Sequence, residues 1–210
     1  MIESENTVYI VDDDPSVRHS LTWLIESVGQ RVQTYASPSE FLQAYRDCGS
    51  GCLILDVRML EISGLDLQEQ LMIKGFRLPI IIITGHADVP MAIRALKAGA
   101  FDFIEKPFND QLLIERIQRA IEHCQNLTKK NLRRQKAEER LSKLTKREKQ
   151  VLEGVVAGKS NKRIAKELDI SIKTIEVHRA NLMTKMQAES LSDLIIKTLL
   201  TDEDNNDLQQ

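Results

Sequence analysis

The sequence Val8-Tyr9-Ile10-Val11-Asp12-Asp13-Asp14 places four apolar residues directly before three carboxylates. Three later stretches, residues 52–56, 79–84 and 101–106, repeat this pattern of an apolar run that ends on a polar side chain. Continuous apolar runs of this kind are typical of strands that are covered on both faces, as in a parallel sheet. The pattern therefore predicts a parallel sheet with polar side chains where its strands end.

The polar side chains at these strand ends predict one site. Since the carboxyl ends of parallel strands meet at the same edge of the sheet, we expect them to lie close together. They are Asp12, Asp13, Asp56, Thr84 and Lys106. Three carboxylates, a hydroxyl and an ammonium suit a divalent cation and a phosphoryl group.

Strands and helices alternate through the first half of the chain. A fifth strand is predicted over residues 31–35, between the first and second helices. The predicted helices begin at Pro15 and Ser37, cover about 65–73 and about 88–98, and start again at Asn109. Five strands alternating with five helices predict an α/β fold with a five-stranded, doubly wound parallel sheet, as in flavodoxin-like proteins.

The charge of the chain changes sign along its length. Residues 1–124 contain 11 Lys and Arg against 18 Asp and Glu, whereas residues 125–200 contain 18 against 9. An acidic half followed by a basic half predicts two modules, the second of which faces a polyanion. Residues 201–210 then form an acidic tail.

The predicted domains are residues 1–124, a linker helix over 125–143 and an all-helical domain over 144–200. The linker contains neither Gly nor Pro, so it is expected to prolong the fifth helix as a solvated segment. The helical domain is expected to hold four helices: one from Thr145 to near Gly158, one capped by Ser160, one over 172–186 and one over 191–200. Two short helices joined by a tight turn in a basic domain favour a helix-turn-helix reader of DNA.

The three cysteines, Cys48, Cys52 and Cys124, have no metal-ligand spacing, and Cys52 is interpreted as a small core residue. The acidic start of the chain has no apolar signal region, and no stretch is long enough to span a membrane. These features predict a cytoplasmic protein with no membrane partner.

The strand-end site predicts phosphoryl chemistry. Asp13 and Asp56 can ligate Mg²⁺ directly, and Asp12 can hold a coordinated water. Asp56 can then act as the nucleophile while the metal, Lys106 and the Thr84 hydroxyl stabilise the phosphoryl oxygens. Asp14 is interpreted as a helix cap only.

Residues 7–122 resemble the receiver domain of bacterial two-component response regulators. The matching motifs are Asp12-Asp13, Leu55-Asp56, Thr84-Gly85-His86 and Lys106-Pro107-Phe108. The resemblance implies a sensor histidine kinase as donor, Asp56 as phosphoacceptor, and Mg²⁺ (with Mn²⁺ as a substitute) that also binds the backbone carbonyl of Arg58. It also implies a cis Lys106–Pro107 bond.

The family resemblance further implies a switch in which the Thr84 hydroxyl is coupled to Phe103. Ordinary core packing of Phe103 is an almost equally good interpretation of the sequence. One residue departs from the family pattern: Leu60 follows Met59 where the family usually has proline. This change frees the backbone beside Asp56 and puts the kinetics of phosphorylation in doubt.

Residues 144–200 resemble the output domain of the LuxR/NarL/FixJ regulators, and the whole chain is most similar to the FixJ branch. The matching motifs are residues 84–91 and 174–181. In the third helix of this domain, Ile175, Leu182 and Met186 are expected to pack inward. His178 is interpreted as a structural histidine.

The opposite side of this helix is predicted to meet DNA. Glu176 and Val177 are candidates for base contacts, and Asn181 for a contact with a base or a phosphate. Candidates for phosphate contacts are Lys173, Thr174, Arg179 and Lys185, together with Asn161 and Lys162 at the start of the second helix.

Two other functions also fit parts of the sequence. Asp12-Asp13-Asp14-Pro15-Ser16 also fits the opening motif of haloacid-dehalogenase-like phosphatases, with Asp12 as the nucleophile. That interpretation lacks a further acidic pair after Lys106 and leaves Asp56 unexplained. A receiver that acts through RNA or protein contacts is the third alternative.

The sequence thus predicts a phosphorylation-controlled transcription factor and not an enzyme. Phosphorylation is expected to expose a homodimer face formed by Val89, Ile93, Leu96 and Ile104. A two-fold dimer requires an inverted-repeat-like promoter site, and RNA polymerase is a further candidate partner.

Overall fold

The computed structural model describes residues 6–46 and 49–207, and the side chains as far as residue 199. Cys48, the acidic start at residues 1–5 and the last residues of the acidic tail, 208–210, lie outside the described residues. The chain forms two compact units, Met1–Thr128 and Lys129–Gln210. One helix, α5 (Asp110–Ser142), belongs to both units.

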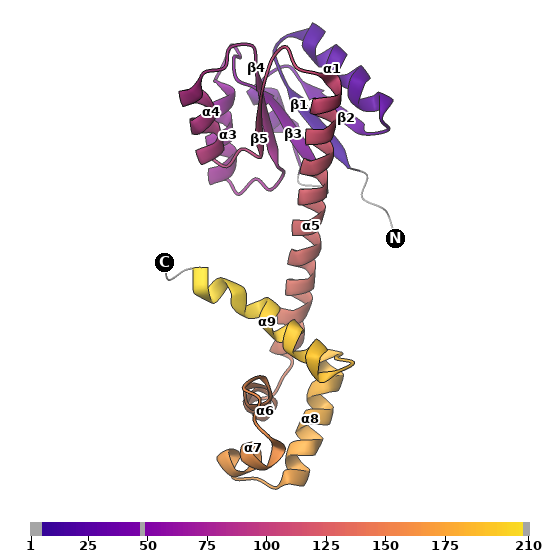
Figure 1. Ribbon diagram of the computed structural model, residues 1–210, viewed down its shortest axis with the longest axis vertical. Coiled ribbons are helices and arrows are strands. Elements are labelled where there is room, and N and C mark those ends of the chain that lie inside the picture. Colours follow the sequence, from indigo (N-terminus) through magenta and orange to yellow (C-terminus); the bar gives the residue numbers. More distant parts are fainter. Residues whose placement is uncertain (1–5, 47–48, 208–210) are drawn as a thin grey trace. The chain divides into compact units, whose positions relative to one another are not determined.

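Unit 1 is built on a five-stranded parallel sheet (Figure 1). Its strands are β1 (Thr7–Val11), β2 (Arg31–Tyr35), β3 (Gly51–Asp56), β4 (Ile80–Thr84) and β5 (Asp102–Glu105). They lie in the order β2-β1-β3-β4-β5, and each neighbouring pair is parallel. The predicted α/β fold with a five-stranded parallel sheet is confirmed.

Helices cover both faces of this sheet. They are α1 (Pro15–Ser27), α2 (Pro38–Ala44), α3 (Gly64–Ile73), α4 (Val89–Lys97) and the first half of α5. One core packs α1 and α5 against one face of the strands, through side chains such as Ile25 and Leu113. The other core packs α2, α3 and α4 against the opposite face, through side chains such as Phe41 and Leu67.

Local polar contacts start the helices just beyond the strand ends. Asp14, Ser37, Ser63 and Asp88 are the N-cap residues of α1, α2, α3 and α4, and each side chain accepts a hydrogen bond from a backbone N–H of the first turn. Pro follows directly or closely in three of the four, where its missing N–H and fixed φ suit a helix start. Helices α1, α2 and α4 therefore begin within five residues of the preceding strand, whereas α3 begins eight residues after the end of β3.

Unit 2 is helical. It contains α6 (Lys146–Val156), α7 (Asn161–Leu168), α8 (Ile172–Met186) and α9 (Leu191–Asp207). Thr145, Ser160 and Ser171 cap α6, α7 and α8 as predicted. Between α7 and α8, Asp169 has φ 54°, in the left-handed region that Asp tolerates better than most residues. This tight turn places two helices in the helix-turn-helix arrangement.

The structure differs from the predictions in one helix boundary and in the burial of one segment. Helix α9 continues to Asp207 instead of ending at residue 200, because no Gly or Pro interrupts residues 191–207. The segment 125–143 is helical, but it is not solvated throughout. Ala137 is buried, and Leu141 packs against the core of unit 2.

Cys52 and Cys124 are free thiols in the interior of unit 1. Burial raises the pKa of the Cys52 thiol far above its ordinary value, so this residue is an inert core side chain. Within residues 6–46 and 49–207, no helix combines the length and the apolar character needed to cross a membrane.

Candidate functional site

Lys106 joins the ends of three strands in unit 1. Its Nζ atom lies 2.8 Å from Oδ1 of Asp56 and 2.9 Å from Oδ2 of Asp12. The two carboxylates are almost completely buried, whereas the side chain of Lys106 is 23% exposed. The strand ends at Asp12, Asp56 and Lys106 therefore converge as their positions in the sequence predict.

Asp56 is held from two sides. Its Oδ2 accepts a 2.7 Å hydrogen bond from the backbone N–H of Arg58, while its Oδ1 binds Lys106. Burial raises the pKa of Asp56 above its ordinary value, and the hydrogen bond from Lys106 offsets only part of that rise. Burial opposes the charge of Lys106 too, but its bonds to Asp56 and Asp12 raise its pKa overall.

Asp12 is fixed by its own loop. Its Oδ1 accepts from the backbone N–H of Asp14 at 2.9 Å. Its backbone carbonyl accepts a 2.7 Å hydrogen bond from the guanidinium of Arg18, a contact that the sequence did not indicate. The Asp14 carboxylate caps α1 by accepting from the N–H of Ser16, as predicted.

The residues at this edge suit a hard cation in their chemistry. Asp12 and Asp56 offer carboxylate oxygens that lie within 2.9 Å of a single nitrogen atom, and Asp13 is half-buried beside them. Oxygen ligands are those that Mg²⁺ prefers. In the described part of the chain, however, no three His, Cys, Asp or Glu side chains form a ready-made metal cluster, and the Lys106 ammonium bridges the carboxylates instead.

Thr84 is fully buried at the end of β4. Its Oγ1 accepts from the N–H of His86 at 3.3 Å, and its carbonyl accepts from the N–H of Lys106 at 2.7 Å. Phe103 is partly buried and packs against the core on the α4 side of the sheet. The peptide bond between Lys106 and Pro107 is cis, as the family resemblance implied.

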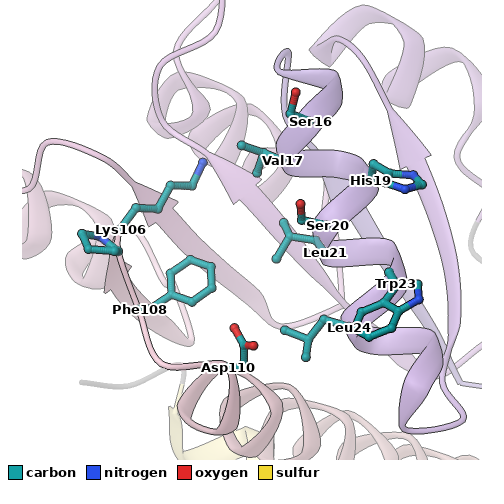
Figure 2. Close-up of a pocket in the computed structure, with 11 residues that line it drawn as sticks. Ser16, Val17, His19, Ser20, Leu21, Trp23, Leu24, Lys106, Phe108 and Asp110 are labelled. Carbon is teal, nitrogen blue, oxygen red and sulfur yellow. The ribbon is translucent and has the colours of Figure 1, made fainter.

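A pocket of about 710 Å³ adjoins Lys106 on the α1 side of unit 1 (Figure 2). Side chains of α1 line one side, and residues 106–108 with Asp110 line the other. Trp23, the only tryptophan of the chain, lies on this rim and is 73% exposed. This pocket was not predicted, although an apolar side chain on the polar face of α1 was a detectable signal in the sequence.

Most of the predicted dimer face is exposed on α4. Val89 is 71%, Ile93 47% and Leu96 52% exposed. Ile104 is only 6% exposed, so its predicted place on this face is wrong. Successive side chains of a strand point to opposite faces, and Ile104 points into the core beneath α1 and α5 while Phe103 points toward α4.

Helix α4 is tied to α3 by polar contacts. The buried Gln68 donates to the carbonyl of Ala95 at 2.9 Å. On the surface, Arg94 pairs with Asp66 at 2.7 Å and with Glu69 at 2.9 Å. The exposed apolar residues of α4 are thus presented by a helix with a defined position.

Helix α8 separates its core side chains from its exposed ones as predicted. Ile175, Leu182 and Met186 are fully buried. The exposed side chains on the other side include Lys173, Glu176, Val177, Ala180 and Asn181, and Lys162 is exposed at the start of α7.

Some predicted DNA contacts have partners within unit 2. Arg179 donates to Oδ1 of Asn161 at 2.8 Å, which joins α8 to the first turn of α7. Thr174 is hydrogen-bonded to the cap residue Ser171. Lys185 pairs with Glu148 of α6 at 2.7 Å. The contacts of Arg179 and Lys185 join residues 18 and 37 positions apart in the chain, so no spacing in the sequence could indicate these two.

Comparison with known families matches both units. Residues 8–118 match the family described as response regulator receiver domain. Residues 142–198 match the family of bacterial regulatory proteins called the luxR family. Together these matches cover most of the chain.

Relatives of similar length match over nearly the whole chain. The transcriptional regulatory protein FixJ of Bradyrhizobium diazoefficiens is 45% identical over 188 residues, which cover 90% of this chain and 92% of that protein. The transcriptional regulatory protein TdiR of Thauera aromatica is 44% identical over 190 residues, covering 90% and 84%. The solved structure of the response regulator StyR is 42% identical, with a TM-score of 0.82 over 92% of this chain and 98% of that one.

Proposed function

The chain belongs to the response regulators that join a receiver domain to a LuxR-family DNA-binding domain, and we propose that phosphorylation of Asp56 switches it. It is a transcriptional regulator and not an enzyme. The observation that carries the proposal is the contact of Lys106 with both Asp56 and Asp12. It supplies a nucleophilic carboxylate together with a cation at the same buried position.

In the proposed reaction, a carboxylate oxygen of Asp56 attacks the phosphorus of a phosphohistidine on the kinase. The O–P bond forms as the P–N bond breaks, and the leaving imidazole nitrogen takes up a proton. Lys106 is free to move from the carboxylates to a phosphoryl oxygen, because its side chain reaches the site from a partly exposed position. The buried Thr84 hydroxyl lies at the neighbouring strand end to hydrogen-bond another oxygen.

Receiver domains in general use Mg²⁺ for this reaction. We propose that Asp12, Asp13, Asp56 and the backbone carbonyl of Arg58 hold the ion, with Mn²⁺ as a substitute. Bound there, Mg²⁺ would neutralise the carboxylates and the charge that the phosphoryl group brings. The protein itself fixes the position of the Asp56 carboxylate, because the backbone N–H of Arg58 donates a hydrogen bond to its Oδ2 atom.

Family membership implies a histidine kinase as the partner of the receiver. We place its docking surface on the pocket beside α1, for a geometric reason. Lys106 contacts Asp56 and also lines this pocket, so a protein that brings a donor imidazole to Asp56 from this side would cover the adjoining surface, which includes Phe108 and the exposed Trp23 (Figure 2). An exposed aromatic residue beside a pocket is typical of an anchor for a protein partner.

The output of the switch is DNA binding in the cytoplasm. We propose that phosphorylated receivers pair through Val89, Ile93 and Leu96, which brings two α8 helices to an inverted-repeat-like promoter site. Glu176, Val177 and Asn181 face the bases in this arrangement, while Lys162 and Lys173 contact phosphates. RNA polymerase is a further proposed partner at the promoter.

The test uses the full chain with acetyl phosphate and Mg²⁺. Intact-mass measurement should show one added phosphoryl group on the wild type and none on Asp56→Asn. Only the phosphorylated wild type should gain affinity for duplexes selected from a random DNA pool. Label on Asp12 would support the phosphatase-like chemistry instead, and phosphorylation that leaves DNA affinity unchanged would favour an output through RNA or protein contacts.

A further inference from the structure

Lys185 lies in the last turn of α8, and it forms an ion pair within unit 2. Its Nζ atom lies 2.7 Å from Oε2 of Glu148, the third residue of α6. The Glu148 side chain is only 4% exposed, whereas that of Lys185 is 35% exposed. A carboxylate this deeply buried needs its cation, because an unpaired buried charge is strongly unfavourable.

The same Glu148 oxygen also organises the start of α6. It accepts from the backbone N–H of Thr145 at 2.7 Å and from the Thr145 hydroxyl at 2.9 Å. Glu148 and Thr145 form a capping box, the reciprocal pair of bonds that starts a helix. One oxygen atom therefore joins the first turn of α6 to the last turn of α8.

Two polar links hold α8 within unit 2: Arg179 joins it to Asn161 at the start of α7, and Lys185 joins its last turn to Glu148 of α6. Ile175, Leu182 and Met186 hold the helix through apolar packing, which has no preferred direction. A charge-assisted hydrogen bond is directional. The contact between Lys185 and Glu148 can thus fix the rotation of α8 about its axis, and with it the direction of Glu176, Val177 and Asn181.

We propose that Lys185 is a positioning residue for DNA recognition, which sets the orientation of α8 through Glu148 and does not neutralise a phosphate. The proposal revises the predicted phosphate contact of Lys185. It rests on the proposed function in one respect, that unit 2 binds DNA through α8.

The variant Glu148→Gln separates the two roles by the direction of its effect. If Lys185 positions α8, loss of the carboxylate charge should lower affinity for a selected duplex about tenfold, the size of effect typical of a coupled polar pair. Affinity for a scrambled duplex should change much less. If Lys185 instead contacts phosphate, the variant frees its ammonium and removes a nearby negative charge, so binding to both duplexes should strengthen.

The salt dependence of DNA affinity gives a second measurement, and a folding defect would not produce the pattern expected there. Lys185→Gln should reduce the preference for the selected duplex while the slope of log affinity against log salt stays at the wild-type value. The matched control is Lys173→Gln, on the exposed side of α8. It should lower the slope by about 0.9, the value for one phosphate contact in B-DNA, and keep the sequence preference.

The double variant Glu148→Gln/Lys185→Gln guards against a folding defect. Two amides can restore a neutral hydrogen bond between α6 and α8, so the double variant should regain most of the preference lost in each single variant. All measurements use the full-length, phosphorylated chain. A slope reduced by about 0.9 in Lys185→Gln, or tighter binding by Glu148→Gln, would overturn the proposal. A wild type that prefers no duplex would count against the proposed function instead.

Discussion

Gly64 lies so close to β3 that a Cβ atom added to it would stand 2.0 Å from the carbonyl oxygen of Asp56. The same atom would lie 2.9 Å from the carbonyl carbon of Asp56 and 3.1 Å from Cγ of Leu55. The backbone of the acceptor residue is thus packed directly against the first residue of α3. Any larger residue at position 64 must move either the helix or Asp56.

We therefore expect Gly64→Ala to destabilise unit 1 by about 2–4 kcal/mol, although alanine at a helix start ordinarily stabilises. The variant should also slow phosphorylation by acetyl phosphate, because Asp56 is displaced. Urea unfolding followed by circular dichroism measures the first effect. The control for the unfolding measurement is Gly85→Ala, since a Cβ there meets no heavy atom of the described residues within 4 Å.

Trp23→Ala tests the docking surface. Loss of this exposed side chain should slow phosphoryl transfer from the kinase about tenfold or more, as for an interface anchor, and leave transfer from acetyl phosphate unchanged. Ile73→Ala is the matched control, because Ile73 is 87% exposed on α3, away from the pocket. Equal slowing with the kinase and with acetyl phosphate would mean that Trp23 stabilises the fold and does not bind the kinase.

Ile93→Glu tests the dimer face on α4. A carboxylate in the middle of the apolar patch should keep the phosphorylated chain monomeric in light scattering, because pairing would bury an uncompensated charge. Phosphorylation itself should proceed normally. Ile73→Glu carries the same charge on another helix and should still dimerise; a dimer formed by Ile93→Glu would place the interface elsewhere.

The pH dependence of unit 2 should depend on Glu148. The hydrogen bond from Lys185 lowers the pKa of this carboxyl from its ordinary value of 4.5, although burial opposes the shift. A lowered pKa in the folded state contributes stability that is present above pH 4.5 and is lost as the pH falls through the folded-state pKa.

The stability difference between wild type and Glu148→Gln should therefore be largest near neutral pH and shrink below about pH 4.5. Circular dichroism follows both units during unfolding. The only tryptophan lies in unit 1, so its fluorescence separates that unit's transition from that of unit 2. A difference that stays constant down to pH 3 would show that folding does not lower the pKa of Glu148.

Much of unit 1 could be predicted because its signals are local. The apolar runs before Asp12, Asp56 and Thr84 indicate buried strands, and parallel pairing then brings their ends together without further information. Lys106 could be placed for the same reason. The caps at Asp14 and Ser160 depend only on neighbours two or three residues away, which the sequence displays directly.

Features that depend on side-chain direction or on distant partners could not be predicted. Phe103 and Ile104 place one apolar side chain on each face of β5, so the sequence does not show which of the two faces α4. The pairing of Lys185 with Glu148 joins two helices across 37 positions of the chain. An exposed lysine and one bound to a buried acid look alike in a basic helix.

The surroundings of Thr84 limit how a signal can leave the acceptor site. Its main chain is fixed by pairing of β4 with β5 and by the N–H of Lys106, so the buried side chain can respond only by turning about its χ1 torsion. A β-branched residue has few staggered positions for that torsion and rarely stops between them. In the proposed switch, a signal through this threonine would therefore be discrete, and a graded stimulus would change the fraction of molecules in each rotamer.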